Sequence, residues 1–227
     1  MAAEAPKGKW LKWLLKVHDV VNMVVISRLL MLTAGMFADR RHENETSRWF
    51  LPLAYSTTLY LSLDAIFIWW YSNLFTRALS LVVHHTAAVA LVVHAILYPE
   101  HERFLLYGML VELNTFFLTA YKIWKTSVLK WLHLLTWVTL RLGWYPYLVF
   151  VYHTEMSSPA YTMFEYGCVL VPHLTVVSLG VFWTLEITTK RSKAMTRGKK
   201  YYAPLNTGGD DSIATTFQGK CRRNSCR

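Results

Sequence analysis

The residues of this sequence that could do chemistry stand inside its most apolar segments. Asp64 follows a Tyr-Leu-Ser-Leu run, and His84 and His85 are adjacent in the next apolar segment. Glu112 and Arg141 stand in the middle of two further apolar segments. A neutral imidazole beside a carboxylate is a general base, because the carboxylate fixes its tautomer and stabilises the imidazolium that forms. Such a pair could deprotonate a hydroxyl or an amine so that it attacks a thioester.

The same residues also have a structural interpretation. Asp64, one histidine and Arg141 could satisfy one another and hold helices in register. We favour function for Asp64 with His84 or His85, and a structural or anionic-headgroup role for Arg141, while Glu112 fits both interpretations. Only one His pair is adjacent, so we expect no metal site. We expect four scattered histidines to be core or interfacial residues: His94, His133, His153 and His173.

Composition and spacing indicate a membrane protein. The 227-residue chain is 54% hydrophobic and only 17% charged, below the ~25% usual for soluble domains. Its charges cluster at the N-terminus, in short gaps and after Lys190, between apolar runs of about 20 residues, the length that crosses a bilayer. We predict an all-α, polytopic helical bundle with about six spans, at residues 20–38, 50–71, 78–97, 104–124, 131–152 and 166–188. Arg28 makes the first span the weakest, so that span could lie partly in the interface or Arg28 could face the bundle.

The predicted organisation is a basic N-terminal segment (1–19), a transmembrane domain (20–190) and a basic tail (191–227) without regular structure from Ser192. Lysines and arginines in the flanks place both termini in the cytosol. The net charge of +10 is what basic ends on a polytopic protein produce, so we expect no nucleic-acid partner. Asn44 begins a glycosylation acceptor triplet on the outer side. Cys168 fits a packing role, whereas Cys221 and Cys226 could be palmitoylated or unmodified.

Depth along the helices brings the polar residues together. At about 1.5 Å per residue from the cytosolic helix ends, His84 lies at ~9 Å, Asp64 at ~12 Å, Arg141 at ~15 Å and Glu112 at ~18 Å. All four fall in the cytosolic half, which predicts either one buried site entered from the cytosol or a chain of structural ion pairs. Asn114 is about 200° around the helix from Glu112 and points elsewhere.

The order of these residues is similar to that of a known family. An Asp in mid-helix is followed by His-His early in the next helix. Then come Gly-x-Leu-Val-Glu-Leu-Asn-Thr-Phe-Phe-Leu at 108–118, Arg-Leu-Gly-x-x-Pro at 141–146, and Phe182-Trp183. The pattern, over roughly residues 50–190, resembles the TLC domain family, which includes ceramide synthases, translocon-associated TRAM proteins and smaller lipid-sensing or lipid-remodelling members.

The resemblance implies lipid work in the endoplasmic reticulum or a related endomembrane or plasma membrane. It implies an acyltransferase that takes acyl-CoA as co-substrate, holds no bound cofactor, and acts on a sphingoid base or a phospholipid. The implied catalytic residues are His84, His85 and Asp64, with the acyl chain in the bundle interior. The implied substrate-binding residues are Glu112, Asn114 and Arg141, and the implied partners are membrane lipids and homo- or hetero-oligomers.

One departure favours an alternative. Ceramide synthases resemble one another in a His-Asp-x-x-Asp cluster on the helix after the His pair, whereas here residues 110–115 read Leu-Val-Glu-Leu-Asn-Thr. The smaller family members therefore fit better by length and by motif. The alternative function is a non-enzymatic lipid-binding protein, a regulator of membrane composition, or a trafficking or assembly factor.

Overall fold

The computed structural model describes residues 7–39, 46–158 and 161–201 of the chain. These residues are helical apart from short connections, and no strand occurs among them. Six helical segments are long and apolar enough to cross a membrane: Trp13–Asp39, Phe50–Trp70, Ala78–Leu97, Pro99–Trp124, Ser127–Met156 and Met163–Thr189. The predicted all-α membrane bundle of six spans is therefore confirmed.

Two of the six spans are interrupted rather than continuous. The fourth consists of α4 and α5 with a turn at residues 110–111, and the fifth consists of α6, a π-helical segment and α7. The helices are α1 (Lys7–Asp39), α2 (Phe50–Trp70), η1 (Ser72–Leu74), α3 (Ala78–Leu97), η2 (Pro99–His101), α4 (Glu102–Met109), α5 (Glu112–Trp124), α6 (Ser127–Thr136), the π segment η3 (Trp137–Trp144), α7 (Tyr145–Met156) and α8 (Met163–Tyr201).

Local chemistry explains where several helices end. Lys125 adopts the left-handed conformation (φ 52°) that commonly closes a helix, and it ends α5. The Thr126 hydroxyl then accepts a hydrogen bond from the Leu129 N–H at 3.4 Å and caps α6. Pro99 begins η2, because its ring fixes φ and its missing N–H is not needed in a first turn.

The two outer helices are longer than predicted. Helix α1 begins at Lys7 rather than at residue 20, and α8 runs to Tyr201, so residues 192–201 are helical rather than irregular. Lys, Arg, Met and Ala are good helix formers, and they extend an existing helix without a new nucleus. Asn44, Cys221 and Cys226 lie outside the described residues, and Cys168 is half-buried in α8.

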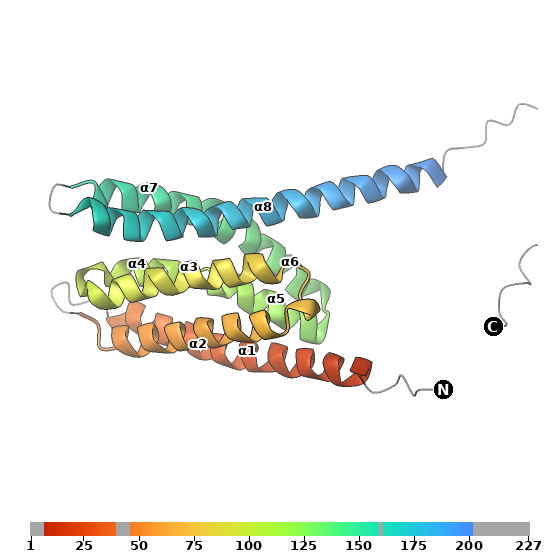
Figure 1. The fold of residues 1–227 in the computed structure, drawn as a ribbon, viewed down its shortest axis with the longest axis horizontal. Coiled ribbons are helices and arrows are strands. Elements are labelled where there is room, and N and C mark those ends of the chain that lie inside the picture. The colour runs from red at the N-terminus through yellow and green to blue at the C-terminus, as the bar shows by residue number, and fades with distance from the viewer. Residues whose placement is uncertain (1–6, 40–45, 159–160, 202–227) are drawn as a thin grey trace, which may run out of the picture. The chain divides into compact units, whose positions relative to one another are not determined.

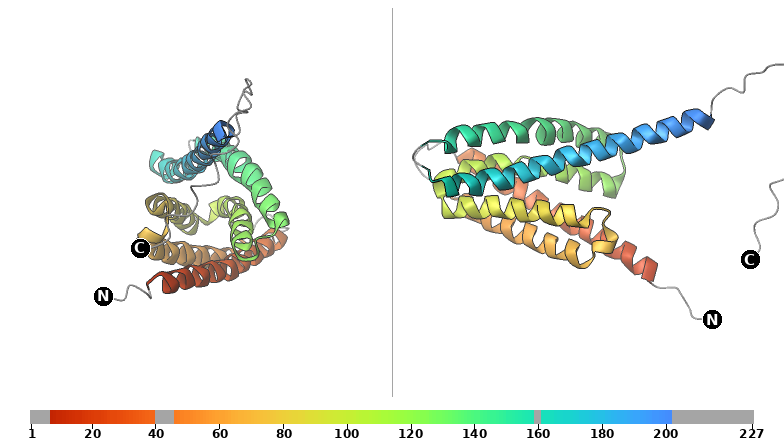
Figure 2. Two further views of the ribbon diagram at one scale, coloured as in Figure 1. Left: turned by 90° about the vertical axis from the view of Figure 1, so that its right-hand side faces the viewer. Right: turned by 45° about the horizontal axis from the view of Figure 1, so that its top comes forward.

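The chain divides into two compact units, Met1–Thr184 and Leu185–Arg227. The first contains the bundle, in which short connections make consecutive helices antiparallel neighbours, as α2 beside α3 and α7 beside α8 (Figures 1 and 2). Its larger core joins α1, α2, α3 and α4, and a second core joins α4, α7 and α8 around Phe104, Leu148 and Tyr152. Many large apolar side chains point outward, as expected of helices that face lipid.

Candidate functional site

The carboxylate of Asp64 lies between two imidazoles from different helices. The side chain is 8% exposed in α2. Its Oδ1 lies 2.6 Å from Nε2 of His18 in α1, and its Oδ2 lies 3.0 Å from Nε2 of His85 in α3. We call these three residues the Asp64 cluster. The predicted contact between Asp64 and the His pair is thus present, through His85.

His18 is a member of this cluster that sequence reasoning missed. The interpretation of residues 1–19 as a basic segment outside the membrane removed it from consideration. The structure places His18 within the first span, where its ring stacks on Phe67 of α2 at 4.4 Å between centroids. Asn22, one turn later, has its amide nitrogen 3.3 Å from His18 Nε2. A His and an Asn four residues apart on an apolar helix were the signal that could have revealed it.

The second nitrogen of His85 has no hydrogen-bond partner among the residues that the structure describes. A carboxylate only accepts hydrogen bonds, so the Nε2 that faces Asp64 carries the hydrogen and the neutral ring leaves a lone pair on Nδ1. That Nδ1 is buried and unpartnered. Buried polar atoms normally have a partner, so this one is available for a proton or a substrate group.

His84 has different neighbours from His85. Its ring lies 5.5 Å from the His85 ring and 5.5 Å from the indole of Trp183, both edge-on. Trp183 in turn donates its indole N–H to the Ser80 hydroxyl at 3.2 Å, which fixes α8 against α3. His84 therefore packs behind His85 rather than against Asp64, and its own Nδ1 is also buried without a partner.

A second polar cluster joins α5, α6 and the π segment. Asn114 is fully buried, and its Oδ1 accepts a hydrogen bond from Arg141 Nε at 2.9 Å. Its amide nitrogen lies 3.0 Å from the His133 carbonyl oxygen and 3.0 Å from the Thr136 hydroxyl. Arg141 also donates to the Thr115 hydroxyl at 3.2 Å. We call these five residues the Asn114 cluster, and its groups are directed at one another.

The π-helical segment sets the direction of Arg141. Its wider turn lies just before Pro146, which lacks the N–H that a regular turn would use. The guanidinium carbon lies 5.2 Å from the Trp137 ring centroid, a cation–π contact that supports a charge inside the membrane. This local departure from α-helical phase is why Arg141 reaches Asn114.

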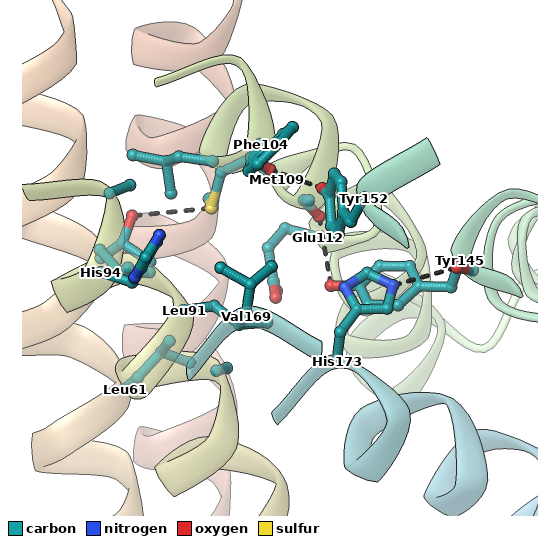
Figure 3. A pocket seen from close by; sticks show the side chains of 16 residues that line it. Leu61, Leu91, His94, Phe104, Met109, Glu112, Tyr145, Tyr152, Val169 and His173 are labelled. Carbon is teal, nitrogen blue, oxygen red and sulfur yellow. Dashed lines mark hydrogen bonds between the residues drawn. The ribbon is translucent and has the colours of Figure 1, made fainter. Parts of the chain in front are cut away.

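Glu112 lies apart from both clusters in the bundle interior. It points into a cavity of about 50 Å³, beside Val169 and the stacked pair of Tyr145 and His173 (Figure 3). Ligand pockets usually measure roughly 300–1,000 Å³, so this cavity is too small for the acyl chain expected in the bundle interior. Aromatic side chains of the second core, among them Phe104, fill that space.

The larger cavity lies between α1 and α2. It measures about 400 Å³ and is lined by His18 and Asp64 among others. The polar residues expected at a shared depth therefore lie in different places. His18 and Asp64 line this groove, Glu112 borders the central cavity, and Asn114 and Arg141 bind each other.

The remaining histidines are bonded at other places. His94 and His173 are buried, His133 is half-buried and His153 is exposed. His94 Nε2 lies 2.9 Å from His101 Nδ1, and His153 Nδ1 lies 2.8 Å from the Tyr166 hydroxyl. Among the residues that the structure describes, no group of three or more His, Cys, Asp or Glu side chains could hold a metal ion.

Fold and site together define a multi-pass membrane protein with acid–base groups buried among its helices. The model of the TLC domain family matches residues 9–189. The chain therefore belongs to the TLC domain family, as its motifs predicted. The match begins 41 residues before the resemblance noted at residue 50, so α1 from residue 9 onward, His18 included, is part of the family domain. No curated protein and no solved structure matches the chain.

Proposed function

We propose that this TLC-family protein transfers an acyl group from acyl-CoA to a hydroxyl or amine of a membrane lipid, with His85 as the general base. The acceptor class is a sphingoid base or a phospholipid. One observation carries the proposal: His85 is held by a buried carboxylate through one ring nitrogen and leaves the other buried and unpartnered. That arrangement is what a general base requires.

The reaction follows from the two nitrogens. Nδ1 of His85 takes the proton of the acceptor, whose oxygen or nitrogen attacks the thioester carbonyl. Asp64 stabilises the imidazolium through Nε2. The carbon–sulfur bond then breaks, and the imidazolium returns the proton to the departing CoA thiolate. His18, on the opposite oxygen of Asp64, holds the carboxylate in position.

Apart from Glu112, the other predicted site residues take supporting roles in this proposal. His84 and Trp183 form the wall behind His85. Asn114 and Arg141 keep α5 and the π segment together, because the Arg141 Nε–H donates to the Asn114 amide oxygen. Glu112 was expected to polarise the acceptor, but it points into the central cavity, away from the Asp64 cluster, so this proposal gives it no part in the transfer.

Compartment and orientation belong to the same proposal. With both termini in the cytosol, the Asp64 cluster falls in the cytosolic half of the membrane, within reach of water-soluble acyl-CoA. The Lys and Arg bias of the flanks supports this orientation. The proposed location is an endomembrane such as the endoplasmic reticulum. There the protein would associate with itself or with another membrane protein.

The alternative is a lipid-binding regulator without catalysis. The small volume of the central cavity favours it, because an acyl chain has no room beside Glu112. In that case the Asp64 cluster would act only to connect α1, α2 and α3.

The test compares whole lipidomes of cells that express wild type, His85→Ala, His84→Ala, His153→Ala or no protein, at matched protein levels. His153 is the control, because it is exposed and bonds only to Tyr166 among the described residues. We expect one lipid class to change with wild type and His153→Ala, and His85→Ala to reduce its rate of formation roughly 10²–10⁴-fold, the usual contribution of a general base. If cells that express His85→Ala show the same lipid changes as cells that express wild type, His85 is not the base and the lipid-binding regulator is favoured.

A further inference from the structure

The groove between α1 and α2 combines a polar floor with apolar walls. Its polar lining consists of His18, Asn22, Arg28, Tyr60 and Asp64, together with Ser56. Its remaining lining consists of Val, Leu and Phe side chains of both helices. At about 400 Å³ the groove lies within the usual range of ligand pockets, unlike the central cavity.

The walls of the groove open toward the lipid-facing surface. Leu59 and Leu63 line the groove and are 62% and 57% exposed. In a membrane span, an exposed apolar side chain faces acyl chains rather than water. A lipid can therefore move sideways from the bilayer into the groove.

Arg28 gives the groove a charge that no carboxylate of the described residues pairs with. It stands two residues from the centre of the span Trp13–Asp39. Among the described residues no carboxylate forms an ion pair with it. A charge at mid-membrane costs about 2.5–3.5 kcal/mol on insertion scales, and such residues normally pair or line a site. The one carboxylate of the groove, Asp64, is already held by His18 and His85.

We propose that this groove binds a single-chain lipid that carries an anionic group, a carboxylate or a phosphate. The anion pairs with Arg28, and the chain lies along the Leu59 and Leu63 wall. At about 400 Å³ the groove falls near the lower end of the range for ligand pockets, which suits one chain rather than two. The site rests on the groove alone, so it stands or falls separately from acyl transfer by His85.

The test measures binding of radiolabelled oleate to the full-length protein, purified in a neutral detergent, with competition by oleyl alcohol and by 1-oleoyl lysophosphatidate. These probes share one chain and differ in the head group. We expect Arg28→Gln to weaken oleate binding about tenfold or more, as loss of a charge-assisted contact does. Arg28→Lys should retain binding, and Leu59→Trp, which fills the groove, should abolish it. Arg48→Gln is the control, because Arg48 pairs with Asp39 outside the groove.

Each outcome decides the proposal. Equal oleate affinity for wild type and Arg28→Gln, or for wild type and Leu59→Trp, would overturn it. The competition experiment needs only the wild-type protein, so it decides the question even where a variant does not fold. If oleyl alcohol displaces oleate as well as lysophosphatidate does, the site does not require an anionic group and the proposal is overturned. Stronger competition by one anion than by the other identifies carboxylate or phosphate as the group bound. The lipidome comparison measures product formation and this assay measures oleate binding, so failure of the base and failure of the groove are distinguishable.

Discussion

The two polar clusters in the membrane interior differ in what they leave unsatisfied. In the Asp64 cluster, one carboxylate serves two imidazoles, and His85 keeps a buried nitrogen with no partner. In the Asn114 cluster, the amide oxygen accepts from Arg141 and the amide hydrogens point at oxygens of His133 and Thr136. The first cluster has a buried atom that can take a proton or a substrate group, whereas the amide of Asn114 in the second cluster is fully paired.

Both clusters place polar residues inside the membrane at a similar cost in free energy. The difference in their unpaired atoms distinguishes a cluster suited to chemistry from one that stabilises the fold. A buried polar network that satisfies itself fixes the arrangement of its helices, and breaking it leaves groups that water cannot reach. A network in which one polar atom has no partner stabilises the fold less than a fully paired one. Acid–base chemistry uses networks of this kind. Substitution should therefore reduce activity in the Asp64 cluster and stability in the Asn114 cluster.

The largest effect is expected for Asp64→Asn. The amide can present its NH₂ group to Nε2 of His85, which moves the ring hydrogen to Nδ1 and removes the base. We expect formation of the wild-type lipid product to fall roughly 10²–10⁴-fold. The free energy of unfolding in detergent should change by only about 1 kcal/mol. The measurement is the labelled lipid product per unit of protein, beside a melting curve of the purified variant.

Asp39→Asn is the matched control for this experiment. Asp39 is also a carboxylate at the α1–α2 side, where it accepts from the Ser47 hydroxyl at 3.0 Å and the Arg48 N–H at 3.2 Å, but it lies at the far end of α1. Its change should leave product formation at the wild-type level. An Asp64→Asn protein that unfolds early and keeps its turnover per folded molecule would reverse the assignment of the two clusters.

The second effect in size is expected for Asn114→Leu. Leucine has a similar size but no polar atoms, so the Arg141 Nε–H loses its acceptor and the buried Thr136 hydroxyl loses a donor. Each stranded group costs about 1–3 kcal/mol, and we expect a loss near 3 kcal/mol in the free energy of unfolding. Thermal unfolding in detergent and steady-state protein level measure it. Thr139→Val, an exposed position in the same π segment, should change stability by less than about 0.5 kcal/mol.

The sequence predicted the parts of this structure that depend on one helix at a time. Span length is a local property of apolar residues, so all six spans were found. The depth of a residue in the membrane follows from its distance along one helix. Asp64 and the His pair were therefore expected at a similar depth, and the contact of Asp64 with His85 is present. His18 was missed because a helix that starts at Lys7 carries it into the membrane, and Lys-rich helical turns are hard to separate from a basic tail.

Rotation between helices was not predictable from the same patterns. Glu112, Asn114 and Arg141 were expected around one substrate, yet the turn at residues 110–111 and the π segment direct them to different places. A phase count assumes 3.6 residues per turn, and a single π turn breaks that count. The sequence therefore predicts which residues share a depth more securely than which residues share a cavity.

The smallest effect is expected for Lys122→Gln, which removes an ion pair beside the Asp64 cluster. Lys122 in α5 lies 3.1 Å from Asp19 in α1, next to His18, with the two side chains 50% and 24% exposed. Exposed pairs contribute about 0.2–1 kcal/mol, and salt screens them, so the loss should be at most about 0.5 kcal/mol and should vanish at high salt. Melting curves at low and high ionic strength measure it. Product formation should stay at the wild-type level, because His18 is held by Asp64 and Phe67 rather than by its neighbour. A large loss of product with an unchanged melting curve would mean that this pair positions His18, and that the functional cluster extends to α5.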